Sequence, residues 1–273
     1  MGPGEPTLLI GYDVECEQDP SVVSRFLKRA EEVHSDLEAP CTFFLMGKVI
    51  ENNLDDLVEL RDRCDLIDYQ QHTYSHLLLK TVYMDDGNEI RLVRGGTLEQ
   101  IEEEVSRTNR LLMDGLGVNC MGLTGPWAYY RGLCDRPDIL DALARHGIRF
   151  TRTWGRNERD YQPVDLDIPP FRYEVQGHPE IMEFPIHGWQ DVHWKMVNGW
   201  ERTGEYLEFL KGTADVVAER GLVWSHGTHD WSSIREDPGM DTIRDLLEYV
   251  AERGIETVDY RTYYESHDGV KGP

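Results

Sequence analysis

The 273-residue sequence has few cysteines and few positive charges. Its five cysteines are an odd, scattered number with no Cys-x-x-Cys pair, which excludes a disulfide framework and a thiolate zinc site. Lys and Arg total 28 against 51 Asp and Glu, a net charge of −23. Because so negative a field repels nucleic acid and anionic membranes, we expect neither as a partner.

Long hydrophobic runs and nucleotide-binding glycine loops are also absent. No stretch approaches the roughly 18 apolar residues of a membrane span, and residues 1–6 carry no positive charge of the kind that opens an export signal. We therefore expect no membrane insertion and a soluble, cytoplasmic protein. No Gly-x-Gly-x-x-Gly turn follows the first strand, which argues against a dinucleotide-binding fold.

Short apolar runs alternate with longer amphipathic segments along the chain, which is typical of repeated βα units. Strands are predicted at residues 8–12, 41–46, 66–69, 121–124, 148–151, 181–186, 222–225 and 256–258. Asp19-Pro20 and Thr97-x-x-Gln100 predict helix starts, and Gly147, Gly221 and Gly254 predict three helix ends that pass directly into strands. The pattern predicts an α/β fold, a distorted (β/α)7-8 barrel forming a single domain over residues 1–273.

Residues 77–96 carry few strand or helix signals and end in Arg94-Gly95-Gly96. We predict that this segment is an insertion or lid beside the site, and an ordinary surface loop is an equal alternative.

Four polar residues follow predicted strands in a pattern that suits a metal ion. Asp13 and Glu15 lie two apart after an apolar run, so in an extended strand they share one face. His72 and His76 are spaced i and i+4, which on a helical turn would let both rings bind one ion. Two imidazoles with one carboxylate leave coordination positions open, as in catalytic zinc sites.

At these residues the sequence resembles the polysaccharide deacetylases of carbohydrate esterase family 4. The resemblance spans most of the chain in five ordered segments: Tyr12-Asp13-Val14-Glu15, Thr42-Phe43-Phe44-Leu45-Met46-Gly47, His72-Thr73-Tyr74-Ser75-His76, Gly125-Pro126-Trp127 and Trp224-Ser225-His226. It implies an amide hydrolase that removes N-acyl groups with a divalent metal, usually zinc.

The resemblance also implies roles for individual residues. Asp13 would be the general base, His226 the general acid, and Glu15, His72 and His76 the metal ligands. Thr73 would brace the histidine loop, and Pro126 and Trp127 would lie at the substrate, with the Trp127 backbone N–H facing the oxyanion.

Two departures from the family pattern stand out. Asp13-Val14-Glu15 replaces the usual adjacent aspartates, which makes Glu15 the least secure ligand. Thr124 occupies the position of an arginine that usually orients the base. Arg131 or Arg152 would have to replace that arginine, or the base would lack one.

The remaining histidines and tryptophans divide between site and core. His187, His193 and His229 are each interpreted as structural, although His187 or His193 could assist the acid. All seven tryptophans lie from position 127 onward. We assign Trp127 and Trp189 to a sugar-binding cleft and Trp224 to the core.

The sequence thus predicts a metal-dependent deacetylase or deformylase acting on an amino sugar, a sugar conjugate or a similar small amide. One alternative is a hydrolase of cyclic ureides or imides, with metal optional. Another is a carbohydrate-binding barrel without catalysis, which the missing arginine at position 124 would suggest.

Overall fold

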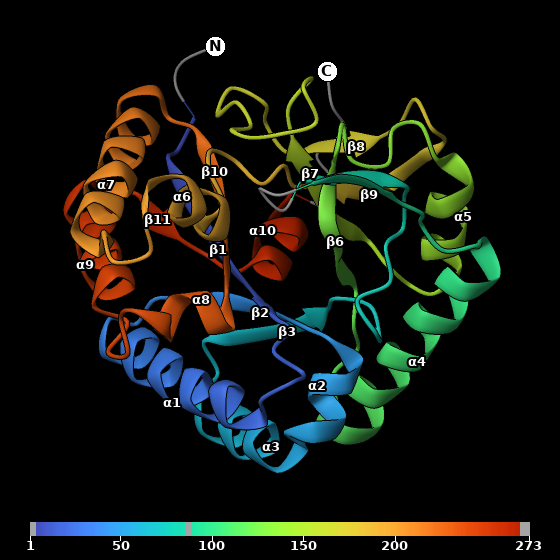
Figure 1. Cartoon of the computed structure of the whole chain (residues 1–273), viewed down its shortest axis with the longest axis horizontal. Helices are drawn as coiled ribbons and strands as arrows, with labels where there is room; N and C mark the ends of the chain where they lie inside the picture. The colour runs from blue at the N-terminus through green and yellow to red at the C-terminus, as the bar shows by residue number, and fades with distance from the viewer. Residues whose placement is uncertain (1–3, 86–88, 268–273) are drawn as a thin grey trace.

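The computed structural model describes residues 4–85 and 89–267. Within these ranges, nine strands form one sheet in the order β10-β1-β2-β3-β6-β7-β9-β8, with β11 beside β1 (Figure 1). The strands are β1 (Thr7–Val14), β2 (Cys41–Leu45), β3 (Ile67–Gln71), β6 (Gly122–Tyr130), β7 (Phe150–Arg156), β8 (Phe171–Tyr173), β9 (His178–Glu183), β10 (Val223–His229) and β11 (Glu256–Thr257). All neighbours pair in parallel except β8 and β9.

Helices surround the curved sheet (Figure 1). They are α1 (Pro20–Asp36), α2 (Gly47–Asn52), α3 (Leu54–Arg63), α4 (Leu98–Leu116), α5 (Pro137–Arg145), α6 (Asp191–Asn198), α7 (Thr203–Arg220), α8 (Asp230–Arg235), α9 (Asp241–Glu252) and α10 (Tyr260–Ser266). Beyond β9, the backbone N–H of His187 donates to the Ser225 carbonyl of β10 at 2.9 Å. This bond links the segment after β9 to β10, which lies at the opposite end of the strand order, and so closes the sheet. The distorted α/β barrel predicted from the sequence is confirmed.

The predicted helix ends are confirmed by their hydrogen bonds and dihedral angles. The Asp19 side chain accepts from the Ser21 N–H, and Thr97 with Gln100 forms both bonds of a capping box. Gly147, Gly221 and Gly254 have φ of 81°, 62° and 68°, the left-handed region that glycine enters without steric cost.

The interior of the barrel is divided between an apolar base and a polar upper part. Leu9 of β1 packs with Tyr260 and Tyr264 of α10 and with phenylalanines of β2, β7 and the segment after β9. Side chains two apart on a strand share a face, so Asp13 lies on the same inner face as Leu9, nearer the carboxyl end of β1. The strand alternation that fills the base therefore also directs Asp13 into the barrel.

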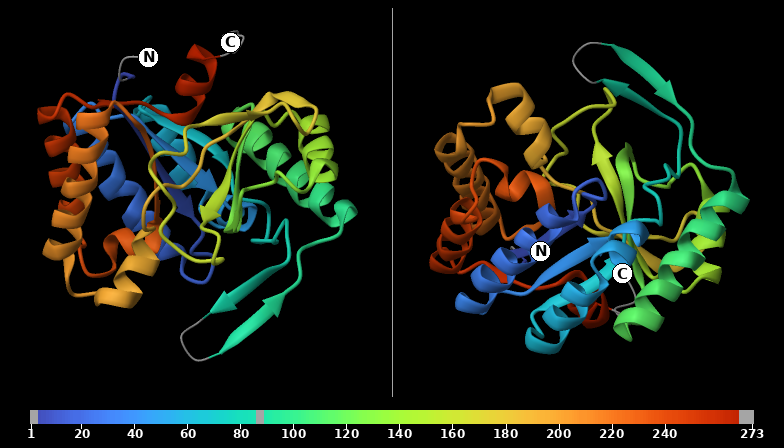
Figure 2. Two further views of the ribbon diagram at one scale, coloured as in Figure 1. Left: turned by 90° about the horizontal axis from the view of Figure 1, so that it is seen from above. Right: turned by 60° about the horizontal axis from the view of Figure 1, so that its bottom comes forward.

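The segment 77–96 contains a hairpin that the sequence pattern did not predict. Strands β4 (Val82–Asp85) and β5 (Ile90–Val93) pair antiparallel, and the hairpin projects from the body (Figure 2). Residues 86–88 of this segment lie outside the described residues. Strand β8 was also not predicted. A lid function for the segment stays a prediction.

None of the helices in the described ranges combines the length and the apolar character needed to cross a membrane.

Candidate active site

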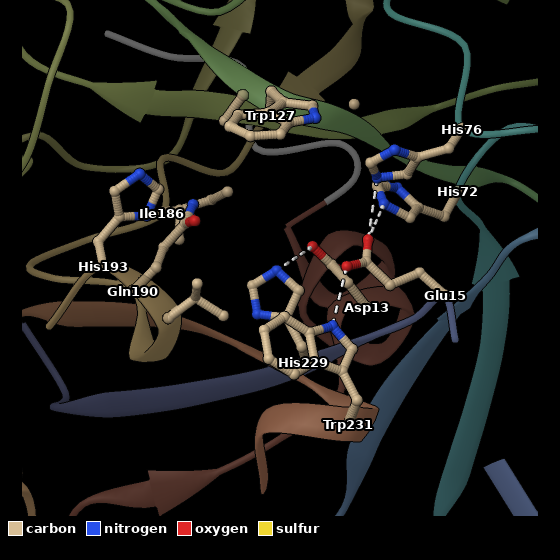
Figure 3. A pocket seen from close by; sticks show the side chains of 13 residues that line it. Asp13, Glu15, His72, His76, Trp127, Ile186, Gln190, His193, His229 and Trp231 are labelled. Carbon is tan, nitrogen blue, oxygen red and sulfur yellow. Dashed lines mark hydrogen bonds and ion pairs between the residues drawn. The ribbon is translucent and has the colours of Figure 1, made fainter. Parts of the chain in front are cut away.

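A cavity of about 150 Å³ opens at the carboxyl ends of the parallel strands. Asp13, Glu15, His72 and His76 all line it, as their positions at the carboxyl ends of the first and third predicted strands indicated (Figure 3). This is the end of a parallel barrel at which loops from several strands converge.

Glu15, His72 and His76 form a compact group of possible metal ligands. Glu15 Oε2 lies 3.2 Å from His72 Nε2 and 2.9 Å from His76 Nε2, and ligand atoms of all three lie within 4.8 Å of one another. His72 Nδ1 is 3.0 Å from the Thr124 carbonyl, which can accept its proton and leave Nε2 for the cavity.

The two histidines lie on a loop, so the helical turn expected from their spacing is wrong. Thr73 and His76 have φ of 59° and 64°, outside the helical range. The Gly47 N–H at the start of α2 donates to the Thr73 carbonyl at 2.9 Å. Thr73 is thus bound through its backbone, and the loop brings both rings to Glu15.

Glu15 is further fixed by Trp231, whose Nε1–H donates to Oε1 at 3.1 Å. Burial raises the pKa of Glu15, but the charge of His229 and the hydrogen bonds of His72 and His76 outweigh it. The pKa therefore lies well below its usual range, and Glu15 is a carboxylate at neutral pH.

Asp13 is held by Arg152 from β7. The Arg152 guanidinium donates to Asp13 Oδ1, and the arginine side chain is fully buried. Thr124 and Arg152 are register partners on β6 and β7, and the Thr124 hydroxyl donates to the Arg152 carbonyl at 2.9 Å. Of the alternatives left open by the sequence, Arg152 contacts Asp13, whereas Arg131 lies exposed on the surface.

The structure does not bring His226 to the cavity. Trp224 packs in the core on the helix side of the sheet, as predicted, and the His226 ring lies 5.2 Å from it. His226 is 1% exposed, and burial lowers its pKa to about 4. An outward-facing, neutral histidine is not placed to protonate a group inside the barrel.

His229 faces the cavity in its place. It lies three residues beyond His226, so strand alternation puts the two on opposite faces, and the β1–β10 register pairs His229 with Asp13. His229 Nε2 lies 4.0 Å from Asp13 Oδ2. The structural role predicted for His229 from the sequence does not account for this position, although the spacing of three residues from His226 is a signal that His229 occupies the inner face.

Asp191, at the first position of α6, orients His229. Its Oδ1 lies 2.7 Å from His229 Nδ1, and its Oδ2 accepts from the His229 N–H and the Thr228 hydroxyl at 3.1 and 2.8 Å. Burial lowers the pKa of His229, but the charges of Asp191 and Glu15 outweigh it and raise the pKa to about 10. His229 is therefore an imidazolium at neutral pH, with Nε2 directed toward Asp13.

The three residues predicted to contact the substrate, Trp127, Pro126 and Trp189, lie in different places. Trp127 lines the cavity in a left-handed backbone conformation with φ of 63°, and Arg156 Nε donates to its carbonyl at 3.1 Å. Pro126 is buried and is not among the described residues that line the cavity. Trp189 lines a separate surface groove, and its ring packs against Tyr161.

The other two histidines also differ in position. His187 is buried and accepts the Ser225 N–H at Nδ1, so its structural interpretation fits. His193 lines the cavity opposite the metal-ligand group (Figure 3).

No family model matches the sequence, and no curated protein sequence matches it either. The structure resembles a probable polysaccharide deacetylase from Pseudomonas aeruginosa PAO1, with a TM-score of 0.69 and 15% identity over 98% of this chain and 92% of that one. It also resembles a Puue allantoinase, with a TM-score of 0.67 and 14% identity over 97% and 91% of the two chains.

A third similar structure is a putative polysaccharide deacetylase from Mycobacterium smegmatis, with a TM-score of 0.66 and 14% identity over 97% of this chain and 93% of that one. At sequence identities this low, the structural similarity establishes a common fold. The chain has the fold of the polysaccharide deacetylases of carbohydrate esterase family 4.

Proposed function

We propose that this protein is a metal-dependent hydrolase that removes an N-acyl group, acetyl or formyl, from an amino sugar, a sugar conjugate or a similar small amide. One observation carries the proposal: a single cavity holds a carboxylate fixed by Arg152, an imidazolium fixed by Asp191, and a group of possible metal ligands. A base, an acid and a metal-bound water are one set of groups that can hydrolyse an unactivated amide.

The chemistry of the donor set fits a divalent ion, for which we propose zinc. Glu15, His72 and His76 would hold it through one carboxylate and two imidazole nitrogens, which leaves positions for water and substrate. A bound ion of this kind supplies Lewis acidity to the amide carbonyl and lowers the pKa of water.

The chain's own residues account for the proton transfers. Asp13, oriented by Arg152, accepts a proton from the attacking water. His229, held by Asp191 and charged at neutral pH, donates a proton to the departing amine nitrogen. The 4.0 Å between His229 Nε2 and Asp13 Oδ2 puts both groups within reach of one reacting centre.

The test separates metal binding from proton transfer. His72→Ala protein is expected to lose bound metal, measured by elemental analysis after purification. Asp13→Asn protein is expected to retain the metal and lose hydrolysis of N-acetyl and N-formyl amino sugars by about 100-fold or more. A fully active Asp13→Asn protein would overturn the assignment of the base.

Hydrolysis of a cyclic ureide or imide is the second candidate, because one structure of this fold is an allantoinase. This candidate predicts ring opening of a cyclic ureide that persists after chelation of metal. Metal-dependent release of acetate or formate from an amino sugar, with no ring opening, would eliminate it.

The non-catalytic alternative has lost its main support. It rested on the absence of the arginine at Thr124, and Arg152 supplies a guanidinium to Asp13 from the neighbouring strand.

A further inference from the structure

A second cavity, of about 380 Å³, adjoins the candidate active site. The two share Trp127 and His193, so these side chains stand at their junction. The outer cavity is also lined by Tyr83 and Ile90 of the β4–β5 hairpin and by Tyr161. A molecule reacting in the inner cavity therefore has adjoining space for a further group.

The walls of the outer cavity are rich in exposed apolar surface. Ile90 is 70% exposed, Tyr83 58%, and Trp127 and Tyr161 each 38%. Large apolar side chains left in water cost free energy, and a two-stranded hairpin is marginally stable without a packing partner. Here four such side chains surround one space that continues from the reaction site.

Arg156 fixes two of these walls relative to each other. Its Nη1 donates to the Tyr83 carbonyl of the hairpin at 2.8 Å, and its Nε donates to the Trp127 carbonyl at 3.1 Å. The Arg156 side chain is 8% exposed, and its Nη1 lies 3.3 Å from Asp160 Oδ2. Binding between walls already held in place loses less conformational entropy than binding between mobile ones.

The charges around the outer cavity are balanced. Arg156 pairs with Asp160, and Arg159 lies 3.9 Å from Glu158. His193 Nδ1 is buried and has no hydrogen-bond partner among the described residues. The surroundings thus favour an uncharged, apolar or planar group that offers at most one hydrogen bond at the junction.

We propose that the outer cavity is a subsite for a second, uncharged ring, linked to the unit that carries the reacting N-acyl amide. The substrate class is therefore a conjugate in which the unit bearing the amide carries a further ring, and that ring would contact Tyr83, Ile90, Trp127 and Tyr161. This inference rests on the proposed hydrolase function and names the kind of substrate.

The test compares two probes, phenyl and methyl N-acetyl-β-glucosaminide, that differ in the added ring. Their dissociation constants are measured by calorimetry on zinc-loaded Asp13→Asn protein, in which turnover is blocked. We expect the phenyl compound to bind about tenfold more tightly, the effect of burying one ring face. Adding Ile90→Ser or Tyr83→Ser should remove that preference.

Leu92→Ser is the matched control. Leu92 is also on β5 and is 58% exposed. It is not among the described residues that line either cavity. Its substitution should leave the preference intact. Equal binding of the two probes, or a preference that survives both Ile90→Ser and Tyr83→Ser, would overturn the subsite.

Turnover by the wild-type protein separates this inference from the proposed function. Ring-dependent binding without hydrolysis of either probe would retain the subsite and reject the hydrolase. Hydrolysis of both probes with equal kcat/KM and equal affinity would retain the hydrolase and reject the subsite.

Discussion

The Arg152 guanidinium donates a hydrogen bond to the Asp13 carboxylate across the barrel interior, from a position 139 residues later in the chain. The bond is possible because the β6–β7 register places Arg152 beside Thr124, and the Thr124 hydroxyl holds the Arg152 backbone. An arginine on the strand next to β6 thus contacts Asp13, the proposed base, which the uncharged Thr124 could not hold by charge.

Replacing Arg152 tests this relationship. Arg152→Lys keeps the charge but removes the planar, multiply donating guanidinium, so the base loses its fixed orientation. We expect kcat for an N-acetyl substrate to fall about 10- to 100-fold while zinc content is unchanged. Arg131→Lys, at the exposed alternative position, should have no effect. Equal losses in both variants would contradict a specific role for Arg152.

Paired substitutions distinguish the two candidate acids. His229→Gln removes the imidazolium that faces Asp13, and we expect kcat/KM to fall about 100-fold or more with metal binding retained. His226→Gln changes a side chain on the helix side of the sheet, so its effect should appear in the denaturation midpoint. Wild-type activity in His229→Gln, with loss only in His226→Gln, would restore His226 as the acid.

The raised pKa of His229 predicts a specific pH dependence in metal-free protein. Below about pH 6.5 this histidine is protonated in both folded and unfolded chains, and its pairing with Asp191 contributes fully to stability. As pH rises toward about 10 the unfolded chain has lost the proton and the folded chain loses it too, so the free energy of unfolding declines. NMR titration of the imidazole and urea unfolding at several pH values measure both effects.

Asp191→Asn provides the control for that titration. It removes the largest charge that raises the pKa of His229, so the imidazole should titrate at lower pH and the alkaline loss of stability should shrink. The charges of Glu15 and Asp13, which also raise this pKa, are unchanged in this variant. An unaltered titration would show that Asp191 does not set the protonation of His229.

The Trp231 indole should strengthen metal binding through Glu15. Trp231→Phe keeps the ring packing but loses the 3.1 Å hydrogen bond to Oε1, and we expect zinc affinity to fall about 10- to 100-fold. Competition with a fluorescent chelator measures this change. Trp200→Phe, at the ring packed 5.5 Å from Trp231, should bind zinc as the wild type does. Unchanged affinity in Trp231→Phe would show that Glu15 is held without the indole.

Local sequence determined most of the fold. Each predicted strand from residues 8–12 to 256–258 has a counterpart in the sheet, because runs of apolar residues and helix-ending glycines act over a few positions. The hairpin β4–β5 was not predicted, since each of its strands has only four residues and Tyr83, Ile90 and Leu92 stay exposed instead of joining the core.

For the candidate site, too, the sequence indicated some residues and the tertiary structure decided others. The sequence by itself indicated the group of possible metal ligands, because Glu15, His72 and His76 all follow predicted strands, but it predicted a helical turn where His72 and His76 lie on a loop. Only the tertiary structure decided which groups hold the proposed base and the proposed acid. Arg152 reaches Asp13, and Asp191 reaches His229, through contacts between distant segments. Those contacts depend on strand register and on which face of β10 turns inward, and a shift of one residue would have exchanged His229 with its neighbours.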